Sequence, residues 1–338
     1  MSSPQGAPLC HRRGPSLSVL RCHGVLCDAC NNICNRLSIM STAKNGAAEM
    51  TVQTVEGWIH DRVRHLHLSP GTTAVLNAAV MNPASAAYTS AADLARVAEV
   101  NTATVTRAAQ ALGFSGWPEF RQEIRARYIR SFTAPELATL HDEQATSSAF
   151  GDTIKQQIAD LNFVRKNVPR QKIKAFAKGL ARGDRRIILA WGSSGGVGRI
   201  LAHHCGIAGY RSEFYDDSIA AANGLADCGP RDVVVIIMFW RLYNPSLVAA
   251  ETARRNGAKI LLISDSTKSQ LAQYADLVIA IPAEGASYFP ALVPCLSVIE
   301  SVCSELEGID VDRTRRSISL AEAQWQSFNI LRSRDLPE

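Results

Sequence analysis

The chain has 338 residues, of which 46% are hydrophobic and 20% are charged, and its formal net charge is +5. This balance is typical of a globular protein with room for two domains, and no apolar stretch reaches the roughly 20 residues that a membrane-spanning helix needs. The mild positive charge is compatible with nucleic-acid binding but does not by itself indicate it. We expect a cytoplasmic protein that does not contact a membrane.

The first segment, residues 1–49, shows no sustained helical or strand period. Four of its five cysteines stand in the run C-x4-C-x2-C-x3-C, a spacing that can bind a metal or an iron–sulfur cluster. The segment mixes Arg, His, Pro and Asn without order, and regular patterning begins right after Met50. We therefore interpret 1–49 as a disordered or mis-started leader. We expect no metal and no cofactor in the protein.

Residues 51–131 show helical patterning throughout. Ser90 is placed to cap a short helix, and Asn101 is a good cap for a second helix over 102–112. Gly113 follows that helix and is expected to end it. Two short helices joined by a three-residue turn predict a helix-turn-helix, in which the second helix docks in the major groove of DNA.

The second helix of this pair exposes small and polar side chains at its start. Threonine can bond to base edges or phosphate, arginine can make paired contacts to guanine, and small residues let a helix enter the groove deeply. From 102 to 130, five arginines stand against two glutamates, an excess expected to help hold phosphates. A generic helical bundle is the alternative at this point. The expected DNA-binding residues are Thr102, Ala103, Thr104, Thr106 and Arg107.

Residues 132–150 are polar and irregular and predict a linker. From 151 to 310, helical and strand patterns alternate, and a C-terminal helix and tail fill 311–338. This spacing predicts right-handed crossovers and a parallel sheet between two helical layers, a three-layer α/β domain. The expected strands are 187–191, 212–215, 233–238, 260–263 and 277–281. The expected helices are 152–166, 169–181, 196–208, 217–225, 245–256, 267–273, 290–307 and 315–330.

Specific residues in both halves resemble RpiR-type transcriptional regulators, which join an N-terminal helix-turn-helix domain to a SIS (sugar isomerase) domain. In the second half, Gly192 and Ser194 fall on marked positions of the SIS pattern, with Ala190 departing from glycine, and 256–276 is a closer match. The resemblance implies an all-α DNA-binding domain followed by a SIS-like domain that binds a carbohydrate derivative and forms homo-oligomers. In the first half the pattern departs at Asn101, Ala108 and Glu99, which replace the usual Ser, the usual Phe and a common turn Gly. The matching positions there are Val100, Ala103, Thr104, Val105, Arg107, Leu112, Gly113, Phe114, Gly116, Trp117 and Phe120.

The turn Gly192-Ser193-Ser194 stands between an expected strand and an expected helix. Hydroxyls and exposed N–H groups at a helix N-terminus can converge on a phosphate or a carboxylate. An ordinary turn between strand and helix is the alternative, since Gly and Ser are common there.

A typical SIS domain has a second phosphate loop after its next central strand, and here that place is taken by 238–243, "MFWRLY". Three interpretations stay open: core or dimer-interface aromatics, a different ligand clamped by Arg241, or a lost site. We favour a changed ligand, with Trp240 or Tyr243 packing on its body. The expected ligand-binding residues are Ser193, Ser194, Arg241, Tyr243 and Ser264.

These features predict a sequence-specific DNA-binding transcriptional regulator that senses a small anionic metabolite, a sugar phosphate or an organic acid. The expected partners are a double-stranded DNA operator, that effector, and further copies of the chain in a dimer or tetramer. The alternative is a SIS-type sugar-phosphate isomerase with an accessory helical domain. An isomerase needs a positioned base. Of His203 and His204, in an expected helix, we expect one to be packed and the other solvated, and Glu284, just beyond an expected strand, has no evident partner. We therefore expect no catalytic residue and no enzyme.

Overall fold

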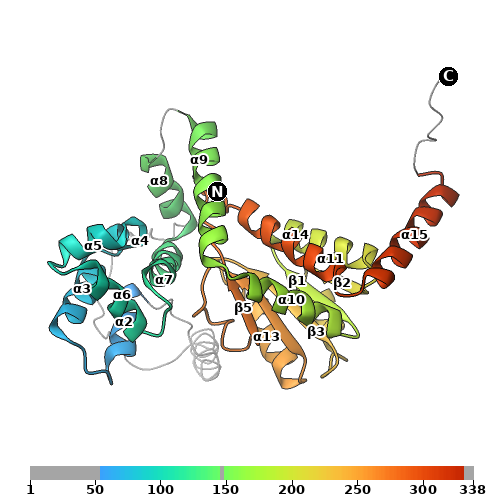
Figure 1. The fold of residues 1–338 in the computed structure, drawn as a ribbon, viewed down its shortest axis with the longest axis horizontal. Coiled ribbons are helices and arrows are strands. Elements are labelled where there is room, and N and C mark those ends of the chain that lie inside the picture. Colours follow the sequence, from blue (N-terminus) through green and yellow to red (C-terminus); the bar gives the residue numbers. More distant parts are fainter. Residues whose placement is uncertain (1–53, 145–147, 331–338) are drawn as a thin grey trace, which may run out of the picture. The chain divides into compact units, whose positions relative to one another are not determined.

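The computed structural model describes residues 54–144 and 148–330 (Figure 1). The predicted leader, residues 1–49, and its cysteine run lie outside the described residues. Within the described ranges, no helix is both long and apolar enough to cross a membrane.

The first described part is all helical, as predicted. Its aromatic and aliphatic side chains meet in one core, where the rings of Phe114 and Phe120 stack at 5.3 Å and Trp58 lies edge-on to Phe114 at 5.9 Å. Burial of such large side chains is the main stabilising contribution in a domain of this size. The helices are α2 (Val55–Val63), α3 (Pro70–Met81), α4 (Pro83–Tyr88), α5 (Ala91–Val97), α6 (Thr102–Ala111) and α7 (Trp117–Arg130).

The helix-turn-helix prediction is confirmed in its local geometry. The Ser90 hydroxyl accepts a hydrogen bond from the N–H of Asp93 at 3.1 Å and begins α5, and the Asn101 side chain accepts from the N–H of Thr104 at 2.9 Å and begins α6. Glu99, in the turn between them, has a φ of 53°, and Gly113 ends α6 with a φ of 83°. Both φ angles lie in the left-handed region of backbone conformation, which glycine adopts with less strain than other residues.

The prediction of an irregular linker is wrong for most of its length. Residues 134–144 form α8 (Ala134–Gln144). The start of this helix is stabilised by local hydrogen bonds between polar residues. The Glu136 carboxylate accepts from both the N–H and the hydroxyl of Thr133, at 2.7 and 2.8 Å. Leu137, on the same helix, is buried and anchors it.

The second half is a five-stranded, all-parallel sheet in the order β2-β1-β3-β4-β5. Strand–helix alternation therefore gave the correct fold class. The strands are β1 (Arg186–Ala190), β2 (Ser212–Tyr215), β3 (Val233–Met238), β4 (Lys259–Ser264) and β5 (Leu277–Ala280). The helices are α9 (Ala149–Asn167), α10 (Arg170–Arg182), α11 (Ser194–Ile207), α12 (Ser218–Leu225), α13 (Asn244–Arg255), α14 (Val293–Glu307) and α15 (Val311–Ser327).

Helices cover this sheet (Figure 1), and a hydrophobic core lies on each of its two faces. On one face α10, α11 and α14 pack against alternate strand residues such as Ile188 and Val235, and on the other α12 and α13 pack against residues such as Ile187 and Val234. Every residue of β1 and β3 is buried, because both faces are covered. The predicted helix 267–273 is instead a series of turns between β4 and β5.

Candidate functional site

Helix α6 presents three of the five predicted DNA-binding residues to solvent. Thr102, Ala103 and Arg107 are exposed, and Thr106 is half-buried with its hydroxyl 3.4 Å from the carbonyl oxygen of Thr102. All four lie at or near the N-terminal end of the helix, the part that reaches base edges in helix-turn-helix proteins.

Thr104 departs from the prediction, because its side chain is buried, only 7% exposed. Its hydroxyl donates to the Asn101 side chain at 3.0 Å and accepts from the Arg107 guanidinium at 2.8 Å. A Cβ added to Gly71 would lie 3.1 Å from the Thr104 methyl group, so the start of α3 closes over this residue. The Thr104 hydroxyl is therefore occupied within the chain, where it holds the exposed Arg107 in place, and a contact of Thr104 with DNA stays a prediction.

The arginines of α7 also depart from the prediction. They were expected to hold phosphates, but their side chains are taken up by contacts within the protein. Arg121 donates to the carbonyl of Thr89 at 3.0 Å, Arg125 pairs with Glu284, Arg127 pairs with Glu123 at 2.8 Å, and Arg130 pairs with Asp265 at 2.9 Å. The positive excess counted along the sequence is thus largely neutralised inside the fold.

At the carboxyl ends of β1 and β3, the structure brings two predicted ligand loops together. Gly192, just after β1, has a φ of 58°, and a Cβ added there would lie 3.1 Å from the Tyr243 hydroxyl, which comes from the loop after β3. Ser193 is exposed at the N-terminus of α11 and makes no capping hydrogen bond, whereas Ser194 is buried. A helix N-terminus of this kind attracts anions.

The aromatic loop after β3 is partly core and partly surface. Phe239 is buried at 6% exposure and packs in the core beneath α14, while Arg241 is exposed and its guanidinium lies 4.9 Å from the centre of the Trp240 ring. Among the described residues, Arg241 has no ion-pair partner. Arg241 is therefore a cation held beside the sheet edge with its charge available.

Ser264 does not join this group. It ends β4, is 2% exposed, and its hydroxyl donates to the Asp265 carboxylate at 3.2 Å. The same carboxylate pairs with Arg130 of α7. Ser264 therefore lies in a buried polar network and apart from Ser193, Arg241 and Tyr243, and its ligand role stays a prediction.

Glu284 lies in the loop after β5, and its partners could not be identified from the sequence. It has three partners rather than none: the Tyr88 hydroxyl donates to it at 2.6 Å, His141 Nε2 lies 3.2 Å away, and Arg125 forms an ion pair with it. Burial alone would raise the pKa of Glu284, but the bonds from His141 and Tyr88 and the charge of Arg125 outweigh it and hold the pKa below its usual value. Only tertiary contacts reveal this cluster.

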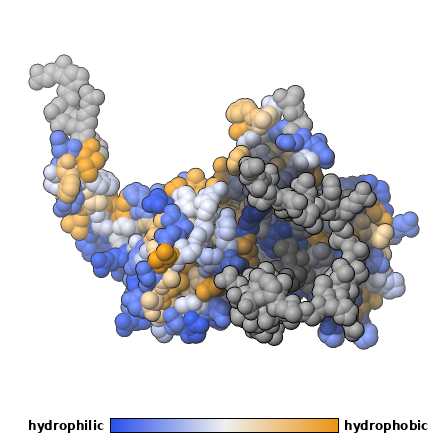
Figure 2. Space-filling model, turned by 180° about the vertical axis from the view of Figure 1, so that it is seen from behind, coloured by the Kyte–Doolittle hydropathy of each residue, from blue (hydrophilic) through white to orange (hydrophobic). Residues whose placement is uncertain are grey.

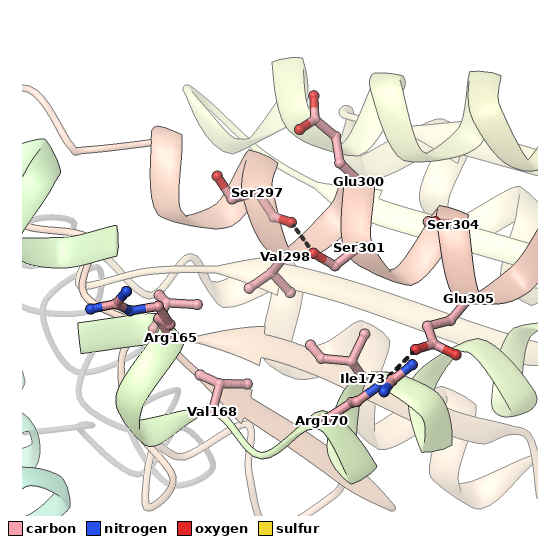
Figure 3. A pocket seen from close by; sticks show the side chains of 11 residues that line it. Arg165, Val168, Arg170, Ile173, Ser297, Val298, Glu300, Ser301, Ser304 and Glu305 are labelled. Carbon is pink, nitrogen blue, oxygen red and sulfur yellow. Dashed lines mark hydrogen bonds and ion pairs between the residues drawn. The ribbon is translucent and has the colours of Figure 1, made fainter. Parts of the chain in front are cut away.

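A groove of about 720 Å³ opens between α9, α10 and α14 (Figure 3). Val168, Ile173 and Val298 form an apolar part of its lining, and an ion pair of 3.2 Å between Arg170 and Glu305 crosses one end. None of the predicted ligand residues lines it. Across the part of the chain that is described, no three His, Cys, Asp or Glu side chains gather in a metal-binding cluster.

The sequence matches known families in both halves. Residues 64–131 match the helix-turn-helix domain of the rpiR family, and residues 179–305 match the SIS domain. The chain is an RpiR-type helix-turn-helix and SIS protein. Its two domains are those of a DNA-binding transcriptional regulator with a SIS sensing domain.

Curated relatives of this chain are named as helix-turn-helix transcriptional regulators. It is 24% identical over 226 residues to the HTH-type transcriptional regulator HexR of Escherichia coli (strain K12), a match that covers 66% of this chain and 78% of HexR. It is 25% identical over 194 residues to the HTH-type transcriptional regulator RpiR of the same strain, covering 56% of this chain and 64% of RpiR.

The fold is similar to that of the Vibrio vulnificus NanR protein, whose structure was solved in complex with ManNAc-6P. The TM-score is 0.52 at 16% identity, and the match covers 80% of this chain and 98% of NanR. At this identity the likeness concerns the fold alone.

Proposed function

We propose that this RpiR-type regulator reads its operator with Thr102, Ala103, Thr106 and Arg107 of α6. The observation that carries the proposal is the Arg107 guanidinium, exposed at the reading helix and bonded at 2.8 Å to the buried Thr104 hydroxyl. An arginine fixed in this way loses little side-chain freedom on binding, and it can make the paired contact to guanine that is the commonest specific contact.

The SIS domain, in this proposal, senses a small anionic metabolite at the carboxyl edge of its sheet, where ligands of open α/β sheets bind. Ser193 and the N–H groups at the start of α11 supply one side of the site, and Arg241 supplies a cation from the loop after β3. Tyr243 stands between them, because its hydroxyl lies against Gly192. A planar guanidinium favours bidentate binding of a carboxylate or phosphate.

The proposal assigns no catalytic step. Glu284, in the loop after β5, is the acid considered above as a base, but its side chain is only 8% exposed and is bonded to Arg125, His141 and Tyr88. A carboxylate held in this way is a poor base for proton abstraction from a sugar carbon, because its basicity is lowered and its lone pairs are occupied. The isomerase alternative would be favoured by turnover of a phosphosugar that Ser194→Ala abolishes.

We also propose that copies of the chain associate through α9 and α15. Of the 19 residues of α9, all of them described, only Asp160 is buried, while Phe150, Ile154 and Ile158 are exposed along one stripe. The 17 residues of α15 bury only Thr314. Figure 2 shows hydrophobic side chains on α15 near its end, where Phe328 is 74% exposed. Long helices with so few partners in one chain are typical of interfaces.

A selection experiment tests the proposed function. The full chain is used to capture DNA from a random pool, and the enriched sequences are read. Two copies of a reading helix should enrich a two-fold symmetric site with half-sites separated by about one helical turn. A pool that stays random, with binding that depends on salt alone, would contradict sequence-specific recognition.

The association surface has its own test, which does not depend on DNA. The double change Phe150→Ser and Ile158→Ser should lower the mass measured by light scattering, while Val248→Ser on α13, where Val248 is 62% exposed, should not. An unchanged mass for the α9 variant would exclude this helix from the interface.

A further inference from the structure

A row of aromatic side chains leads away from Arg241 at the carboxyl edge of the sheet. The Arg241 guanidinium lies 4.9 Å from the centre of the Trp240 ring. That ring meets the Tyr288 ring edge-on at 5.9 Å, and Tyr288 meets Phe289 in the same manner at 5.7 Å. Trp240, Tyr288 and Phe289, which we call the aromatic row, therefore join a positive charge to a strip of ring surface.

Two loops that are far apart in the sequence supply the aromatic row. Trp240 comes from the loop after β3, and Tyr288 and Phe289 come from the loop after β5. Strand β4 lies between β3 and β5, so the contact between Trp240 and Tyr288 spans the end of β4. The row is therefore a product of the tertiary fold and not of a local motif.

The loop after β5 is folded tightly enough to fix the end of the aromatic row. The Ala291 N–H donates to the carbonyl oxygen of Ala283 at 2.9 Å and closes the loop at its base. A Cβ at Gly285 would collide with the Phe289 carbonyl oxygen, so the backbone approaches itself at a point where only glycine fits. Near the tip, the Phe289 N–H donates to the Ser287 hydroxyl at 3.4 Å. Phe289 is therefore carried on a closed loop with backbone contacts of its own.

Phe289, at the end of the aromatic row, is left largely uncovered by the described residues. It is 71% exposed, and Tyr243, two residues beyond Arg241, is 41% exposed. A phenylalanine held in this way gains free energy when an apolar group covers it, because ring surface is then removed from water. Exposed rings next to a cation that has no ion-pair partner among the described residues are typical of a binding surface for a ligand with both characters.

The two loops offer few groups that bind the hydroxyls of a sugar. Residues 239–243 carry a single hydroxyl, that of Tyr243, and it lies against Gly192. In the loop after β5, the Ser287 hydroxyl already accepts from the Phe289 N–H. A sugar placed on ring surface gives up hydrogen bonds to water without replacing them, and this costs free energy. The surface beside Arg241 therefore favours an apolar body over a polyhydroxy one.

We propose that the effector is an organic anion with an apolar body, such as a carboxylate that carries a ring or an alkyl chain. Arg241 binds the anionic group, and the body lies along Tyr288 and Phe289. The guanidinium fixes the orientation of the anion by bidentate hydrogen bonds, and the covered rings select for the body. This inference rests on the proposed function, which places the effector at Arg241, and it narrows the effector to one chemical class.

Three anions distinguish an apolar body from a sugar: propionate, 3-phenylpropionate and glucose 6-phosphate. Their affinities for the full chain are obtained from the rise of the thermal midpoint with anion concentration. The two carboxylates share the group that Arg241 binds and differ by one ring, so the ratio of their affinities measures what the ring adds. We expect 3-phenylpropionate to bind about ten-fold more tightly than propionate, and more tightly than glucose 6-phosphate.

Variants of Phe289 assign the contribution of the ligand's ring to the aromatic row. Phe289→Ser should reduce the ratio to about two-fold or less, because the covering surface is gone. Phe289→Leu keeps an apolar side chain and should retain most of the ratio. Phe328→Ser removes a phenylalanine of similar exposure, 74%, at the end of α15 and should leave the ratio unchanged. Arg241→Ala should lose the binding of both carboxylates.

The outcomes separate this inference from the proposed function. Equal affinities for the two carboxylates, tighter binding of glucose 6-phosphate than of 3-phenylpropionate, or an unchanged ratio in Phe289→Ser would overturn the apolar body and leave the anion site at Arg241 standing. If none of the three anions raises the midpoint, or if Arg241→Ala binds them as the native chain does, the proposed sensing site itself is contradicted, and the inference is overturned with it.

Discussion

At the scale of single residues, two exposed arginines are held by a neighbour that leaves their charge available. Arg107 is held by a hydrogen bond to Thr104, and Arg241 is held by the face of Trp240. The arginines of α7 show the opposite case, because carboxylates and carbonyls of the same chain already satisfy them. Sequence alone cannot tell these cases apart, since the partners lie more than 100 residues away for Arg125 and Arg130.

The role of Arg241 is tested by Arg241→Ala. Sugar phosphates and organic acids are screened for those that raise the thermal midpoint of the native chain. The variant should lose that shift, because the clamping cation is gone, while its midpoint without ligand should stay within about 1 °C, since exposed residues contribute little to stability. The control Arg211→Ala removes another exposed arginine and should keep the shift. A variant that responds like the native chain would make Arg241 a structural residue.

At the scale of elements, the caps of the helix-turn-helix were predictable because they are local. Ser90, Asn101 and Gly113 act within four residues of their own positions. The helix at 134–144 was missed because its polar composition is typical of a linker, and the helix expected at 267–273 did not form because that stretch makes contacts with α7 instead, as in the bond from Thr267 to Glu119 at 3.1 Å.

The Asn101 cap provides a measurable prediction for α6. Asn101→Ala removes an acceptor for the N–H and hydroxyl of Thr104 and should lower the free energy of unfolding of the helical domain by about 1 kcal/mol. Urea unfolding followed by Trp fluorescence measures the change. Asn101→Ser, which keeps a capping oxygen, should recover most of the loss, and equal losses for both variants would exclude capping as the cause.

The buried pair of Arg130 and Asp265 gives a larger effect. Arg130→Ala leaves the Asp265 carboxylate, 6% exposed, without its cation and should cost roughly 3 kcal/mol of stability. The double variant with Asp265→Asn should recover part of it, because the unpaired charge is gone. Denaturant midpoints of the four proteins in this cycle measure the coupling, and additive single effects would show that the pair does not interact.

At the scale of the whole molecule, sequence patterns predicted the order of domains, the parallel sheet and the helix pair α5 and α6. Those features depend on periodicity, caps and short motifs, which act locally. The ion pairs that α7 makes with the second half of the chain could not be predicted. Glu284 and Asp265 become neighbours of the α7 arginines only once the chain is folded. The same is true of Ser264, whose burial follows from its neighbours rather than from its own motif.

That α6 reads DNA is tested most directly by comparing Arg107→Ala with Arg211→Ala on the DNA selected by the native chain and on a scrambled sequence. Affinities are measured at two salt concentrations, so that base recognition is separated from phosphate attraction. Arg107→Ala should bind the selected DNA about ten-fold or more weakly and lose discrimination against the scrambled sequence, while Arg211→Ala keeps both. Native affinity and discrimination in the Arg107→Ala protein would contradict the assignment of α6 as the reading helix.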